Sequence, residues 1–123
     1  MQFTPKSEQE ITDSKVAKAG IYAFEIQDAW EKKSAAGNDM FELKVEVSNG
    51  NGMRRTLPDY LLPKGISAEK LLHCSIACGI RAKYDSGLLS HEDFIGKRGR
   101  VRLGIEKKKG FPDRNVIEDY LAA

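Results

Sequence analysis

A short cluster of metal-ligand side chains is the first feature that could do chemistry. His73 and Cys74 are adjacent, Cys78 follows four residues after Cys74, and His91 lies further along the chain. In a helix the two thiols share one face, so they could meet one metal ion. Zinc sites usually join two closely spaced pairs, however, and the second pair is missing. We therefore interpret Cys74 and Cys78 as small packing residues, because free cysteine is usually buried, and we expect no metal and no cofactor.

Signatures of other catalytic chemistry are weak. The acidic pairs Glu92-Asp93 and Glu118-Asp119 are adjacent in sequence, so their carboxylates do not converge on one reacting atom in a helix or strand. The run Gly96-Lys97-Arg98-Gly99 lacks the Lys-Ser/Thr pair that a phosphate-binding loop needs. No local pattern couples a serine or cysteine nucleophile to a histidine base. We expect that the protein is not an enzyme.

Basic and aromatic side chains form clearer clusters. The net charge is only +2, but residues 97–114 hold eight Lys or Arg against two acids, a balance of +6. Such a local field attracts a polyanion even when the whole chain is nearly neutral. Rings beside the cations would allow stacking on unpaired bases. The candidates for phosphate contact are Lys32, Lys33, Arg54, Arg55, Arg100, Arg102, Lys107, Lys108, Lys109 and Arg114, and those for stacking are Trp30, Tyr60 and Phe111.

These candidates also have purely structural interpretations. Trp30 could belong to the core, and Phe111 could plug one end of the fold. A lysine run at a turn can be solvated charge only, and the arginines within 98–106 could pair with Glu42 or Glu46. If those two glutamates share a face with nucleic acid, they would repel it.

Alternation of apolar and polar residues predicts five strands. The clearest has Phe41, Leu43, Val45 and Val47 alternating with charged residues, which is typical of a strand with one buried face. The others are expected within 20–30, 53–62, 98–106 and 111–122. The connections are a hairpin loop at 31–39, a tight turn at 49–52 and a lysine-rich turn at 107–110.

Helical signals fall between the third and fourth strands. Ser67 as N-cap and Gly79 as the C′ residue predict a helix over about 68–78. Ser90 marks a second, shorter helical start. Three strands, a helix and two strands is the element order of the OB-fold, a five-stranded Greek-key barrel that binds through its second and third strands and two hairpin loops. An α+β half-barrel has the same order, but we expect closure because it hides strand edges.

Length and composition limit the remaining classes. The chain has 123 residues and a mass of 13.7 kDa, which suits one domain, expected at 20–123 after a loosely ordered lead-in at 1–19. No apolar run is long enough for a membrane span or a signal peptide. Two cysteines cannot form a disulfide framework, which indicates a reducing cytoplasm.

Three segments together resemble a known family. They are GIYAFEIQDAWEKKSAAGNDMFELKVEV, LLHCSIACGI and, most strongly, DFIGKRGRVRLGIEKKKGFPDRNVIEDYLA, spanning about residues 20–121. The chain resembles the small phage-encoded or prophage-encoded single-stranded-DNA-binding proteins with an OB-fold. The resemblance implies non-catalytic coating of single-stranded DNA in replication or recombination, with contacts from Lys32, Lys33, Lys107–Lys109 and Arg114. The acidic tail that recruits partners in some such proteins is not evident here.

Two other hypotheses stay open from the sequence. An OB module could serve as a protein-interaction or structural accessory through an apolar patch, and a zinc enzyme could use the His and Cys cluster. The expected partners are single-stranded DNA, replication or recombination proteins and further copies of the chain. Preference for DNA over RNA leaves no motif that the sequence would reveal.

Overall fold

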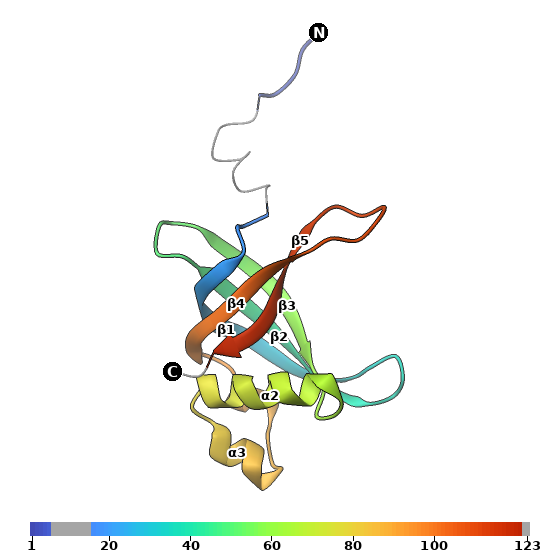
Figure 1. Cartoon of the computed structure of the whole chain (residues 1–123), viewed down its shortest axis with the longest axis vertical. Coiled ribbons are helices and arrows are strands. Elements are labelled where there is room, and N and C mark those ends of the chain that lie inside the picture. The colour runs from blue at the N-terminus through green and yellow to red at the C-terminus, as the bar shows by residue number, and fades with distance from the viewer. Residues whose placement is uncertain (6–15, 122–123) are drawn as a thin grey trace.

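A computed structural model describes residues 1–5 and 16–121 of the chain. It contains one antiparallel sheet whose strands are β1 (Gly20–Lys33), β2 (Asp39–Ser48), β3 (Arg54–Leu61), β4 (Arg98–Glu106) and β5 (Arg114–Leu121). Between β3 and β4 lie α2 (Ile66–Ala77), α3 (Arg81–Ser86) and the short 3-10 helix η1 (His91–Asp93). The mainly β class, with a helix after the third strand, is confirmed (Figure 1).

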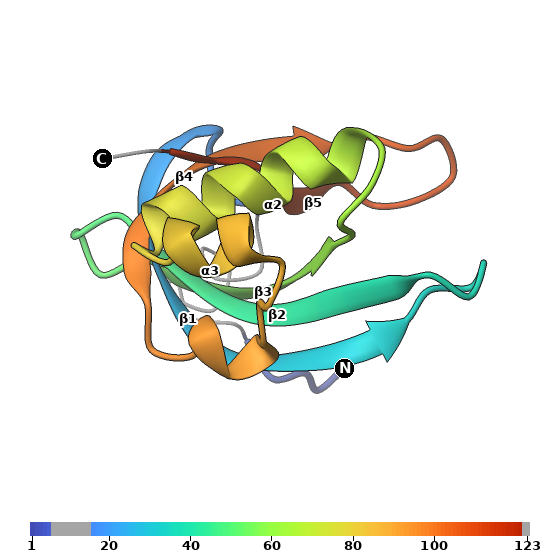
Figure 2. The ribbon, with the colours of Figure 1, turned by 90° about the horizontal axis from the view of Figure 1, so that it is seen from below.

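The sheet is open, with the strand order β3-β2-β1-β4-β5. The closed barrel expected from the sequence is not seen, because no strand pairing joins β3 to β5 in the described part of the chain. The sheet nevertheless curls strongly, and α2 lies across the opening between its two edge strands (Figures 1 and 2). Side chains, not backbone hydrogen bonds, span the gap.

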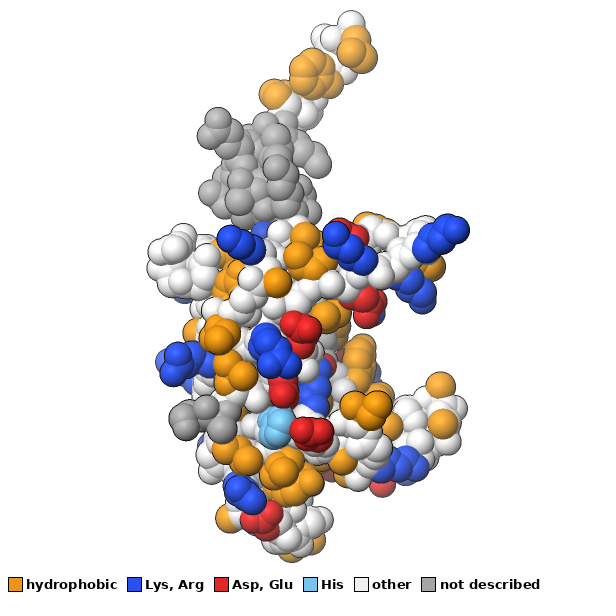
Figure 3. Space-filling model, in the orientation of Figure 1, with side chains coloured by type: hydrophobic (Ala, Val, Ile, Leu, Met, Phe, Trp, Pro, Cys, Tyr) orange, Lys and Arg blue, Asp and Glu red, His pale blue; other side chains and the backbone are white. Residues whose placement is uncertain are grey.

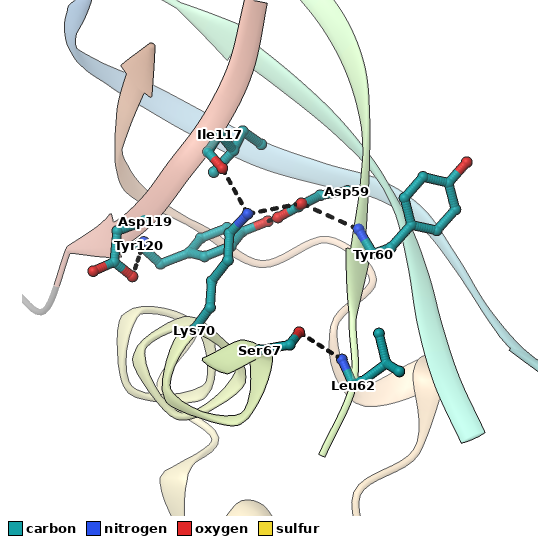
Figure 4. Close-up of polar contacts among 8 residues, drawn as sticks. All are labelled: Asp59, Tyr60, Leu62, Ser67, Lys70, Ile117, Asp119 and Tyr120. Carbon is teal, nitrogen blue, oxygen red and sulfur yellow. Dashed lines mark hydrogen bonds and ion pairs between the residues drawn. The ribbon is translucent and has the colours of Figure 1, made fainter. Parts of the chain in front are cut away.

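Three polar side chains make this bridge, which we call the seam: Asp59 of β3, Lys70 of α2 and Tyr120 of β5. The Tyr120 hydroxyl donates to Asp59 Oδ2 at 2.8 Å. Lys70 Nζ donates to Asp59 Oδ1 at 2.9 Å and to the Ile117 carbonyl at 2.6 Å (Figure 4). Burial raises the pKa of the Asp59 carboxyl, and the Lys70 charge opposes this shift. The seam is therefore a buried network in which each polar group has a partner.

The core lies between the inner face of the curled sheet and α2. The alternation predicted for 41–47 is confirmed, since Leu43, Val45 and Val47 are fully buried. Rings fix both ends of the core: Phe24 meets Tyr120 edge-on at 5.3 Å, and Phe41 packs against Phe94 at 5.2 Å between ring centroids. Such edge contacts add to the stabilisation from apolar burial.

The helices differ from expectation at two points. The long helix begins at Ile66, because Gly65 takes a φ of 66° at its N-cap and Ser67 Oγ instead accepts from the Leu62 amide at 2.9 Å. Helix α3 was not predicted, since its six residues carry no apolar period. The start predicted at Ser90 is confirmed by a capping box with Asp93.

Part of the predicted lead-in, residues 6–15, lies outside the described residues, as do residues 122 and 123. Ala17 is buried, and its amide donates to Asn115 Oδ1 of β5 at 2.7 Å. The Asn115 amide returns a bond to the Ala17 carbonyl at 2.9 Å, so the chain is attached to the sheet before β1 begins. Among the helices described here, none combines the length and apolar character that crossing a bilayer needs.

Candidate nucleic-acid interface

Two hairpin loops project from the same side of the molecule. The β1–β2 loop (residues 34–38) and the β4–β5 loop (residues 107–113) extend in one direction in both ribbon views, and β3 runs between them (Figures 1 and 2). The space-filling view shows a recess between the two projections, with Lys or Arg at the tip of the upper one (Figure 3). We call this space the recess.

Trp30 faces outward because of an irregularity in β1. The pairing of β1 with β2 shifts between Ile26 and Asp28, so Gln27 is an extra residue, a β-bulge. Strict alternation from the buried Ile26 would place Trp30 in the core. After the bulge the parity changes, so that Ala29 is 2% exposed and Trp30 is 40% exposed. The core interpretation of Trp30 is therefore wrong.

Three side chains form a row across the outer face of the sheet. Trp30 of β1 pairs with Glu42 of β2, which pairs with Tyr60 of β3. Paired residues lie on the same face, so the two rings flank the carboxylate. Tyr60 is 48% exposed, and it points away from the seam while its neighbour Asp59 points into it (Figure 4). We call Trp30, Glu42 and Tyr60 the aromatic row.

Lys32 joins the aromatic row through two contacts. Its Nζ lies 2.5 Å from Glu42 Oε1 and 6.0 Å from the centre of the Trp30 ring. The hydrogen bond to Glu42 raises the pKa of Lys32 above its usual value, and Tyr60 adds to the effect. The lysine that was expected in a loop thus lies in the last residues of β1, because the strand continues to Lys33.

The two glutamates that counted against nucleic-acid binding carry compensating partners. Glu42 pairs with Lys32, as described. Glu46 accepts from Gln27 Nε2 at 2.9 Å and lies 3.9 Å from Arg54 Nη1. The pairing with the β4 arginines that the sequence allowed is not formed. A paired carboxylate repels a phosphate less than an unpaired one does.

The β4–β5 loop carries the second basic and aromatic cluster. The Phe111 amide donates to the Lys108 carbonyl at 3.0 Å, and Lys108 Nζ lies 5.0 Å from the centre of the Phe111 ring. Phe111 was expected in the last strand, but it lies in the loop and is 64% exposed, because β5 starts only at Arg114. Arg114 pairs with Glu106 at 2.8 Å and closes the base of the hairpin. Lys107 and Lys109 have no such partner among the described residues.

The other predicted cations do not join these clusters. Arg54 and Arg55 begin β3, six residues or about 20 Å along the strand from Tyr60, next to the β2–β3 turn at the opposite end of the sheet (Figure 1). Arg55 also shares the inward parity of Asp59. Lys33 forms an ion pair with Asp39 where the β1–β2 hairpin begins.

Arg100 and Arg102 lie on the outer face of β4, away from the aromatic row. Arg100 pairs in register with Ala23 of β1, seven residues or about 23 Å along that strand from Trp30. Arg102 lies 3.8 Å from Glu118 of β5. The structure therefore separates the predicted site into one region around the recess and a second set of cations elsewhere on the sheet.

The candidate metal ligands point to separate partners. Cys74 and Cys78 are buried with their Sγ atoms 4.0 Å apart, and burial raises the pKa of the Cys74 thiol well above its usual value. His73 Nδ1 lies 2.9 Å from Asp119, and His91 Nδ1 lies 3.0 Å from Glu31. Within residues 1–5 and 16–121, no group of three or more such side chains is placed to hold a metal ion.

Sequence reasoning missed the structural importance of Asp59. The signal was present, because Asp59 interrupts an inward-facing series formed by Arg55, Leu57 and Leu61. A carboxylate at a buried position needs a partner, and that requirement predicts a lysine or a hydroxyl opposite it. The partners, Lys70 and Tyr120, come from α2 and β5, and their identity depends on the tertiary fold.

Comparison with known proteins adds no relative. No family model matches the chain, and no curated protein matches its sequence. The functional argument therefore depends on the geometry of the recess and on the residues around it.

Proposed function

We propose that this chain is a non-catalytic, sequence-tolerant single-stranded-DNA-binding protein that acts in phage or prophage replication or recombination. The observation that carries the proposal is the aromatic row, half-exposed on the sheet beside two projecting loops, one of which carries Lys107–Lys109 and Phe111. Single-strand binders combine cations that follow the phosphates with rings that stack on bases. The recess offers both.

An OB-type barrel is the fold that we propose for this arrangement. The strand order β3-β2-β1-β4-β5 is the order of that fold opened between its third and fifth strands. OB-folds are often only partly closed, and they bind through the face of strands 2 and 3 and through the 1–2 and 4–5 loops. The seam supports the proposal, since it holds β3 and β5 together where a fully closed barrel would have backbone pairing.

In the proposed complex, phosphates follow the lysines of the β4–β5 loop. Lys107 and Lys109 are available for this, and Lys108 holds Phe111 beside them. Bases stack on Trp30, Tyr60 and Phe111, each of which exposes 40% or more of its surface. Counterion release would then drive binding and make it strongly dependent on salt.

Substitution of Lys107, Lys108 and Lys109 by alanine tests the proposal. We expect affinity for a mixed-sequence, unpaired oligonucleotide of about 20 nucleotides, longer than one OB-fold covers, to fall about tenfold or more at low salt. The slope of log K against log salt should fall by about 2, or 0.7 for each lost phosphate contact on a single strand. Fluorescence anisotropy of the labelled strand and the emission of Trp30 measure both quantities.

Alanine at Lys18, Lys64 and Lys83 gives a control with the same change of charge away from the recess. This variant should bind nearly as tightly as the unmodified chain. If the unmodified chain leaves both anisotropy and Trp30 emission unchanged at low salt, the proposed function is wrong. Equal losses in the two triple variants would show that only the total charge matters and would remove the recess from the argument.

One observation favours protein interaction as a second candidate function. A hollow of about 780 Å³ opens below the β1–β2 hairpin, and its apolar lining includes Met40, Phe41, Leu71, Tyr84 and Leu89. Lined in this way, it could take an apolar side chain of a partner. Capture of a partner that persists after Lys107–Lys109 are changed to glutamate, with no binding of the oligonucleotide, would favour this function over DNA binding.

A further inference from the structure

We propose that Glu42 is a specificity-determining residue that makes the recess prefer cytosine over thymine in single-stranded DNA. This inference rests on the proposed function and adds to it a base preference, which a purely sequence-tolerant binder would lack. The observation behind it is the position of a carboxylate between the two rings that would stack on bases.

The position of Glu42 is fixed by its neighbours. It lies on the middle strand of the three that form the aromatic row, with one ring in register on each side. Its side chain is 18% exposed, far less than the rings beside it, and Lys32 Nζ holds Oε1 at 2.5 Å. Among the described residues no donor reaches the second oxygen, Oε2. The row therefore presents one open acceptor between two stacking surfaces.

The chemistry of the acceptor determines which bases fit. A carboxylate accepts hydrogen bonds only, and glutamate typically accepts from the cytosine N4 amine. Thymine presents the carbonyl O4 where cytosine presents this amine, so two acceptors would face each other. In a single strand these base edges are free to be contacted. A base stacked on Trp30 or Tyr60 therefore meets an oxygen that rewards cytosine and repels thymine.

Lys32 makes this arrangement compatible with a polyanion. Its ammonium compensates the charge of Glu42 and also lies near the Trp30 ring. An unpaired glutamate at this place would weaken binding of every strand, whatever its bases. With Lys32 in place, the general repulsion is reduced while the directional acceptor remains. Glu46, two residues along β2 on the same face, has no rings in register with it, because its partners are Glu25 and Thr56.

The experiment compares oligo-dC with oligo-dT of equal length at neutral pH, using the full chain and two variants. The two bases are both pyrimidines, so differences in stacking are small. We expect the unmodified chain to bind oligo-dC at least about fivefold more tightly, the lower end of what one specific base contact provides. Glu42→Gln keeps the shape but adds a donor that can face thymine O4, so the preference should fall toward one. Glu46→Gln removes a charge from the same strand and should keep the preference.

The results separate the inference from the function on which it rests. Equal affinity of the unmodified chain for both strands, or an unchanged ratio in Glu42→Gln, overturns the role of Glu42 and leaves DNA binding intact. A loss of preference that is equal in Glu46→Gln also overturns it, because charge alone would then explain the effect. If neither strand binds, the proposed function and the inference both fail.

Discussion

Two regions on opposite sides of β3 use the same kinds of side chain for different ends. Asp59 points inward to the seam, and its neighbour Tyr60 points outward in the aromatic row (Figure 4). Each region combines a tyrosine, a carboxylate and a lysine: Tyr120, Asp59 and Lys70 in the seam, and Tyr60, Glu42 and Lys32 on the outer face.

The difference between the regions is the number of polar groups left open. In the seam both oxygens of Asp59 accept hydrogen bonds, and Tyr120 is 1% exposed. On the outer face the Tyr60 ring is 48% exposed, and one carboxylate oxygen of Glu42 is open. Buried polar networks stabilise a fold when they are complete, whereas open acceptors and ring faces can bind a ligand. Burial and completeness, not residue type, assign structure to one region and binding to the other.

The largest expected effect comes from breaking the seam. Lys70→Ala leaves Asp59 buried without its cation, and we expect the free energy of unfolding to fall by about 3 kcal/mol, as for other broken buried pairs. Urea denaturation measures the change, with the exposed Lys44→Ala as control. Oligonucleotide affinity of the folded fraction should stay the same. A large loss of affinity without a loss of stability would show that the seam belongs to the binding site.

A smaller and opposite effect is expected on the outer face. Tyr60→Ala should weaken oligonucleotide binding by about 1–3 kcal/mol, the usual contribution of one base stack, and should change the free energy of unfolding little because the ring is half exposed. Tyr60→Phe keeps the ring and should bind like the unmodified chain. Anisotropy titration and urea denaturation of the same samples separate the two quantities. Equal binding by the alanine and phenylalanine variants would remove stacking at this position.

The smallest effect concerns pH and the seam alone. Burial raises the pKa of Asp59 above its ordinary value of 3.8, against the opposing effect of Lys70. The folded state therefore holds the proton more tightly than the unfolded state does, and the stability that this contributes is lost as pH rises through the folded pKa. Unfolding free energies of the unmodified chain and of Asp59→Asn, measured from about pH 4 upward, should differ in this way. A difference that rises with pH would contradict the assignment.

The sequence predicted the parts of the fold that depend on local pattern. Alternation at 41–47 gave β2 with its correct inner face, and Ser90 was correctly placed at the start of η1. The lysine run was correctly placed between the last two strands. These features need only the residues themselves and their nearest neighbours along the chain.

Features that depend on distant contacts could not be predicted in this way. The bulge in β1 forms where Gly96 and Lys97 bond the backbone of Ile26, at 2.8 and 2.9 Å, seventy residues further along the chain. The row of Trp30, Glu42 and Tyr60 depends on that bulge and on the registers of two strand pairs. The open seam depends on side chains from β3, α2 and β5. Base types and charge nominated the rings and the lysines, but only the tertiary fold brings some of them together.

Gln27 gives the aromatic row an unusual kind of dependence. Its side chain is exposed and bonds only to Glu46, so many residue types would serve at this position. Its presence in the chain is another matter, because this one inserted residue sets which way every side chain of the second half of β1 faces. Evolutionary drift at position 27 is therefore tolerable by substitution and not by deletion. Loss of a single codon would exchange Trp30 for Ala29 on the outer surface, and the reading frame of the sheet, as much as that of the gene, is what the protein must conserve.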